Sequence, residues 1–87
     1  MTIYTYARYR RSLRRLDPQI RKVAQAQIAL FRRDAFDPRL DTHRLHGKLK
    51  NQWSFSVDVR YRILFEFIND ARDEAVFLDI GTHALYH

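Results

Sequence analysis

Hydrophobic and polar residues follow two different periods along the chain. In the first third, apolar side chains recur every three or four positions, which is typical of helices that bury one face. The pattern predicts a short strand over Thr2–Tyr6 and a helix over Ala7–Leu16. A second helix is predicted from Pro18 to Arg33, because Asp17 can cap its first turn and proline suits the first helical position.

The remainder of the chain alternates with the period of two that is typical of strands. Trp53–Val59 and Ala75–Ile80 are predicted strands, and the nearly continuous apolar run Tyr61–Ile68 is predicted to be a central one. Arg39–Asn51 is polar and contains Gly47, so it is interpreted as a loop. Two helices followed by an antiparallel meander predict an α+β fold of order β-α-α-β-β-β, in which the helix pair covers one face of an antiparallel sheet.

Length and composition favour one folded domain over residues 1–87. Hydrophobic residues make up 46% of the chain and charged residues 30%, a balance typical of globular proteins. Cysteine is absent, which excludes disulfides and thiolate metal sites. No run approaches about 18 apolar residues, and the first residues lack the pattern of a signal peptide. We therefore expect no membrane partner and a cytoplasmic location.

Positive charge is concentrated in the first part of the chain. The net charge is +6, and residues 1–33 carry nine Arg or Lys residues against one Asp. Arginine outnumbers lysine thirteen to three, and its planar guanidinium binds phosphate with two hydrogen bonds. The distribution indicates a polyanionic partner, with RNA as the best candidate, although solvated helix faces would give the same pattern.

The segment after the last predicted strand, from Gly81 to His87, carries three groups that can move protons or contact phosphate: His83, Tyr86 and His87. Histidine changes its protonation near neutral pH and so suits a general acid or base. His83 follows a strand end and a glycine, where functional loops begin. For Tyr86, closing the core beside Leu85 is an equally good interpretation.

Arg62 interrupts an apolar strand, where an unpaired charge is costly. It therefore either forms a salt bridge, with Asp58, Glu66 or Asp79, or faces a functional cleft. We favour the cleft, in which its guanidinium would bind a phosphate.

Five further candidates lie outside the predicted helices. His43 and His46 belong to the polar loop, where no carboxylate–histidine signature makes them metal ligands. Lys48, Lys50 and Arg60 are candidate substrate-binding residues, as is the terminal histidine, with a solvated loop or a turn as the alternative. Cleavage of RNA by protein groups alone needs a base for the 2′-hydroxyl, an acid for the leaving oxygen and cations for the charged transition state.

Four segments, in this order and spacing, resemble the RelE/ParE superfamily of bacterial toxins: Leu45-His46-Gly47, Trp53-Ser54, Tyr61-Arg62-Ile63-Leu64-Phe65 and Gly81-Thr82-His83 with Tyr86. The resemblance is nearest to mRNA interferases of the RelE, YoeB and YafQ type and covers nearly the whole chain. It implies a helix hairpin over an antiparallel sheet, metal-independent cleavage of mRNA in the ribosomal A site, and no cofactor. It also implies three partners, namely a cognate antitoxin, mRNA and the ribosome with its 16S rRNA.

The resemblance further implies roles for single residues. By position, Arg62 contacts the scissile phosphate, His83 is the general acid and Tyr86 positions a nucleotide. The general base is His46 or, as the second choice, His43, which fall where relatives carry a loop arginine and a loop histidine.

Departures from the family pattern leave other functions open. Trp53 and Phe55 stand where RelE carries a pair of strand lysines, and Arg60 and Asp79 stand where YafQ carries an aspartate and an arginine. The loop glutamate of YoeB has no evident counterpart. A ParE-like inhibitor of DNA gyrase and a catalytically weak RelE-fold binding protein are therefore the alternatives to an mRNA endoribonuclease.

Overall fold

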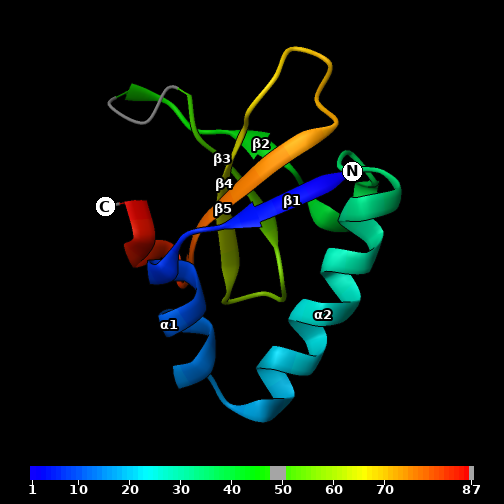
Figure 1. The fold of residues 1–87 in the computed structure, drawn as a ribbon. Helices are drawn as coiled ribbons and strands as arrows, with labels where there is room; N and C mark the ends of the chain where they lie inside the picture. The colour runs from blue at the N-terminus through cyan, green and yellow to red at the C-terminus, as the bar shows by residue number, and fades with distance from the viewer. Residues whose placement is uncertain (48–50, 87) are drawn as a thin grey trace.

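The computed structural model describes residues 1–47 and 51–86, which form two α-helices and a five-stranded sheet (Figure 1). The elements, in chain order, are β1 (Thr2–Thr5), α1 (Ala7–Arg15), α2 (Pro18–Arg33), the short 3-10 helix η1 (Pro38–Leu40), β2 (His43–Arg44), β3 (Trp53–Ser56), β4 (Arg62–Phe67), β5 (Glu74–Gly81) and the 3-10 helix η3 (His83–Tyr86). The predicted α+β architecture is confirmed. Each helix and strand that the periodicity predicts is present, with ends shifted by at most three residues.

The strands are ordered β1-β5-β4-β3-β2 across the sheet. All neighbouring pairs are antiparallel except β1 with β5, which are parallel. The sheet is therefore mixed, and the pair of β1 with β5 departs from the expected antiparallel order. Parallel strands need a long crossover connection, and the segment between β1 and the later strands, which includes both helices, provides one. β2 lies within Arg39–Asn51, so the interpretation of that whole segment as a loop is wrong; two residues are too few to show a strand period.

The second helix begins as the sequence predicts. The Asp17 carboxylate accepts a hydrogen bond from the backbone N–H of Gln19 at 2.8 Å, and Pro18 is the first helical residue. Ala24 and Phe31 lie seven residues apart, two turns along one side of the helix, and both are fully buried. This side of α2 therefore packs on the sheet.

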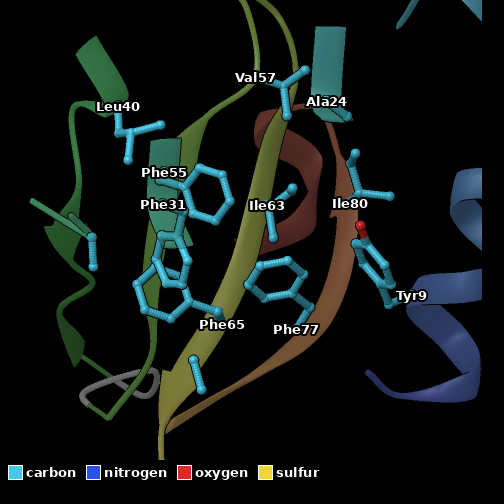
Figure 2. Close-up of a cluster of buried hydrophobic side chains, with 12 residues drawn as sticks. Tyr9, Ala24, Phe31, Leu40, Phe55, Val57, Ile63, Phe65, Phe77 and Ile80 are labelled. Atoms are coloured by element: carbon cyan, nitrogen blue, oxygen red, sulfur yellow. The ribbon is translucent and has the colours of Figure 1, made fainter. Parts of the chain in front are cut away.

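Phe31 lies in an aromatic core between the helices and the sheet (Figure 2). Its ring stacks on Phe55 with the centroids 4.7 Å apart, and it meets Phe65 and Phe77 edge-on at 5.0 and 5.5 Å. Tyr9 of α1 packs edge-on against Phe77 at 5.4 Å, and burial raises the pKa of Tyr9 to about 12. These contacts join both helices to the three central strands.

The opposite face of the sheet, which we call the second face, carries the candidate residue Arg62. Alternation along β4 directs Ile63 and Phe65 into the core and therefore directs Arg62 and Leu64 onto the second face. On β5 the register shifts next to Leu64, and Leu78 has no cross-strand partner, which is the pattern of a β-bulge. Leu78 consequently joins Leu64 in a small hydrophobic cluster separate from the aromatic core.

Candidate functional site

Arg62 begins β4 on the second face and is only 7% exposed. Its Nε donates a hydrogen bond to Oγ of Ser54 at 3.0 Å, and its Nη2 donates to the backbone oxygen of Asp41, also at 3.0 Å. Its Nη1 lies 3.6 Å from the Asp41 carboxylate. A buried guanidinium is tolerated here because these groups replace most of its contacts with water.

The three carboxylates expected as salt-bridge partners of Arg62 are engaged elsewhere. Asp58 accepts hydrogen bonds from two backbone N–H groups in the turn between β3 and β4, at 2.8 and 2.7 Å. Asp79 forms an ion pair with an arginine of α1 at 2.9 Å, and Glu66 accepts from an amide side chain at 3.5 Å. The prediction that Arg62 would form a salt bridge with Asp58, Glu66 or Asp79 is therefore wrong, because the carboxylate that pairs with it belongs to Asp41.

His43 is brought beside Arg62 by β2. It pairs with Ser54 across β2 and β3, and its Nδ1 lies 3.0 Å from the backbone oxygen of Asp41 and 3.3 Å from Nη2 of Arg62. A carbonyl only accepts and a guanidinium only donates, so the shorter contact is satisfied when Nδ1–H donates to the carbonyl. In this tautomer Nε2 carries the lone pair, on a side chain that is exposed and can meet a substrate.

Asp41 holds the two groups together through its backbone. It follows η1 with φ 49° and ψ 46°, in the left-handed region that few residues other than glycine, asparagine and aspartate adopt. The segment is anchored on both sides, since Leu40 is fully buried and the hydroxyl of Thr42 donates to the backbone oxygen of Ala35 at 2.6 Å. The turn thereby directs one carbonyl toward both Arg62 and His43.

His83 lies at the end of the neighbouring strand. Gly81, the last residue of β5, pairs with Arg62, and the chain then turns into η3, which begins at His83. A Cβ atom at Gly81 would lie 3.0 Å from Cδ2 of Leu85, so the glycine lets η3 fold back onto the sheet. The fold thus brings His83 to the same end of β4 as Arg62.

The other candidates lie apart from this cluster or outside the description. His46 is exposed in the segment after β2. Arg60 is an exposed residue of the turn between β3 and β4, in agreement with the interpretation of that position as a turn. Lys48, Lys50 and His87 lie outside the described residues, as does the side chain of Tyr86.

Two residues of the cluster were missed from the sequence. Ser54 stands between Trp53 and Phe55, so the alternation that predicted β3 also indicated a small polar group on the same face as Arg62. Asp41 gave no comparable signal, because its role depends on a left-handed backbone and on contacts with a strand twenty-one residues away.

Over residues 1–47 and 51–86, no group of three or more His, Asp or Glu side chains is arranged to hold a metal ion. The helices described there are also too short or too polar to cross a membrane.

No family model matches the chain, and comparison with curated proteins finds no match. Solved structures do match. A YoeB/ParE toxin from Agrobacterium tumefaciens superposes with a TM-score of 0.78 at 14% identity, covering 95% of this chain and 99% of that one. The YafQ-containing DinJ–YafQ toxin–antitoxin complex from E. coli gives 0.71 at 18% identity, covering 97% and 93%. The toxin–antitoxin complex RelBE2 from Mycobacterium tuberculosis gives 0.64 at 25% identity, covering 94% and 96%. The chain therefore has the fold of the RelE/ParE toxin superfamily, and its structural neighbours include toxins of the RelE, YoeB and YafQ type.

Proposed function

We propose that the chain is the toxin of a type II toxin–antitoxin pair and that it cleaves mRNA on the ribosome. The observation that carries the proposal is the contact between Arg62 and His43, a buried guanidinium 3.3 Å from the imidazole of an exposed histidine. A cation beside a base is what attack of a 2′-hydroxyl on a phosphodiester requires. The expectation of an antitoxin partner is supported by the toxin–antitoxin complexes among the structural neighbours.

In the proposed reaction, Nε2 of His43 takes the proton of the 2′-hydroxyl while the 2′-oxygen forms a bond to phosphorus. The bond between phosphorus and the 5′-oxygen breaks, and His83 donates a proton to that oxygen. The products are a 2′,3′-cyclic phosphate and a free 5′-hydroxyl. We assign the base to His43 in preference to His46, because His43 contacts Arg62 directly whereas His46 is exposed beyond β2.

Arg62 has one side available for the scissile phosphate. Its Nε and Nη2 are hydrogen-bonded, whereas its Nη1 lies 3.6 Å from the carboxylate of Asp41, whose side chain is 75% exposed. A phosphate oxygen would take the place of the carboxylate and gain a charge-assisted hydrogen bond. Removing such a donor raises the barrier by about 2–4 kcal/mol.

The test is induced expression in bacteria, with primer extension on a translated reporter mRNA and on the same mRNA without its start codon. We expect the wild type to cut within codons of the translated message only, His83→Ala to cut neither, and the matched control His46→Ala to cut as the wild type does. Growth arrest without cuts but with a DNA-damage response would refute the proposal in favour of a gyrase target. Ribosome binding without cuts would leave a binding protein.

A further inference from the structure

The first helix carries a row of positive charge along one side. Five of the nine residues of α1 are arginine and none is acidic. Arg8, Arg11 and Arg15 follow one another at intervals of three and four residues, so they form a row with about 5–6 Å between successive Cβ atoms. All three residues of this arginine row are exposed. Like charges at these intervals destabilise a helix, so an anionic partner that neutralises the row would remove this repulsion.

The guanidinium groups of the arginine row are accessible to a ligand. Within residues 1–47 and 51–86, the side chains of Arg11 and Arg15 have neither a hydrogen bond nor an ion pair. Nε of Arg8 pairs with Oδ2 of Asp79 at 2.9 Å, yet the Arg8 side chain is 72% exposed. The ion pair fixes the direction of this guanidinium and leaves the N–H groups of Nη1 and Nη2 to a ligand.

An exposed aromatic ring lies at the start of the arginine row. Tyr6 directly precedes α1 and is 54% exposed, and its side chain has no hydrogen bond or ring contact among the residues that the structure describes. Tyr6 and Arg8 line one cavity of about 270 Å³, so the ring and the guanidinium are neighbours. Tyr4 is similarly exposed, at 50%, but its hydroxyl donates to the carboxylate of Glu74 at 3.3 Å. The two tyrosines therefore differ in the charge beside them.

We propose that the arginine row, together with Tyr6, binds single-stranded RNA. A base stacks on the ring of Tyr6, and the phosphates that follow it contact the arginines in turn. A basic track beside an exposed aromatic ring is the arrangement with which proteins bind single strands without reading their sequence. The interval of about 5–6 Å along the row is close to the separation of successive phosphates in such a strand. An acidic protein segment would match the charge, but this interval and the exposed ring favour RNA.

The arginine row begins near the candidate site. Asp79, which holds Arg8, pairs with Leu64 across β5 and β4, and Arg62 lies two residues before Leu64. Neighbouring strands are about 4.8 Å apart and rise about 3.3 Å per residue, so the Cα atoms of Asp79 and Arg62 lie about 8 Å apart. A strand with one phosphate at Arg62 can therefore extend to the start of α1 (Figure 1). The identity of this strand as the flank of the mRNA substrate rests on the proposed function, whereas RNA binding by α1 can be measured without it.

The test is a titration of a fluorescent single-stranded RNA of about twelve nucleotides, followed by anisotropy at several salt concentrations. The purified chain carries His83→Ala to limit toxicity in the producing cells. Each phosphate contact with a single strand contributes about 0.7 to the slope of log affinity against log salt. We therefore expect Arg11→Gln to lower the slope by about 0.7. Arg33→Gln removes the same charge from an exposed position of α2 and should keep the slope.

A matched pair of tyrosine variants tests the stacking. Tyr6→Leu should weaken binding about 5- to 100-fold and leave the salt slope unchanged, because a base loses its stacking partner. Tyr4→Leu changes an equally exposed ring and should alter the affinity by less than about twofold. The duplex of the same RNA should bind more weakly than the single strand, because its bases are stacked on one another and cannot reach Tyr6. Thermal unfolding establishes that each variant is folded.

An unchanged slope in Arg11→Gln, equal losses in the two tyrosine variants, or a duplex that binds as tightly as the single strand would overturn the inference. Absence of RNA binding would overturn it in favour of an acidic protein segment. The two hypotheses fail separately. The expected RNA binding in a chain whose wild type cuts no mRNA would contradict the proposed function and leave the binding surface standing. Undiminished cutting by a chain that carries both Tyr6→Leu and Arg11→Gln would retain the function and contradict the role of this surface.

Discussion

Replacing Asp41 with glycine and with valine separates the role of its backbone carbonyl from that of its carboxylate. Both substitutions remove the carboxylate, but they differ in the backbone conformation that they accept. Glycine adopts the observed φ of 49° without strain, whereas a β-branched residue is strongly disfavoured there. We expect Asp41→Gly to keep the carbonyl directed at Arg62 and His43, and Asp41→Val to displace it.

The structure sets the size of the expected difference. The carbonyl accepts from Nη2 of Arg62 at 3.0 Å, and a hydrogen bond to a charged group contributes about 1.5–3 kcal/mol. The left-handed conformation costs an ordinary non-glycine residue about 1–2 kcal/mol, and a β-branched residue is a genuine outlier there, so in Asp41→Val relief of the strain outweighs the contact and most molecules lose it. A lost contact of this size lowers the rate about 10- to 100-fold. In Asp41→Gly the carbonyl contact is kept and only the 3.6 Å ion pair with a side chain that is 75% exposed is lost, so the rate should stay within about threefold.

The assay is single-turnover cleavage of a defined mRNA on programmed ribosomes, with thermal unfolding of each variant to establish that it is folded. Equal rates for two folded variants would refute the positioning role of the carbonyl. A glycine variant as slow as the valine variant would instead assign the effect to the carboxylate.

Three other substitutions test separate parts of the molecule. His83→Ala should lower the single-turnover rate by about 100-fold or more, and a loss under about threefold would remove it from the role of general acid. Phe31→Ala, in the centre of the aromatic core, should lower the free energy of unfolding in urea by about 3–5 kcal/mol, whereas a loss under about 1 kcal/mol would contradict the stacking against Phe55. The ion pair with Arg39 lowers the pKa of Asp37 to about 2, so the stability it provides is present above the ordinary pKa and is lost as the pH falls from about 4 toward 2. In Asp37→Asn the unfolding temperature should change less over that range, and identical curves would contradict the linkage.

Most of the fold could be predicted because it follows from local chemistry. The helices repeat every three or four residues and the strands every two, and the cap formed by Asp17 needs only its own turn. The position of Arg62 on a strand was recognisable for the same reason, since a charge in an apolar run is conspicuous. These features depend on residues close together in the sequence.

The partners of Arg62 could not be predicted because they depend on tertiary structure. Asp41 acts through the carbonyl of a residue in the left-handed conformation, and a pattern of residue types does not predict such a backbone angle. His43 and His46 are equivalent in a polar loop, and only the two-residue strand β2 distinguishes them, by pairing His43 with Ser54. This contact is why we propose His43, and not His46, as the base.

Arg62→Met tests whether the buried guanidinium serves function at the expense of stability. Removing a charge that is 7% exposed relieves a desolvation cost of several kcal/mol. The substitution leaves the hydroxyl of Ser54 and the backbone carbonyl of Asp41 without their donor, although the carbonyl still accepts from His43. Losing these two hydrogen bonds costs about 1–3 kcal/mol of stability. Methionine fills most of the same volume, so we expect a chain at least as stable as the wild type by urea unfolding, monitored through Trp53, yet unable to cleave mRNA. A methionine variant destabilised by more than about 2 kcal/mol would mean that Arg62 is part of the structural framework, and the loss of activity on substitution would then carry no information about catalysis.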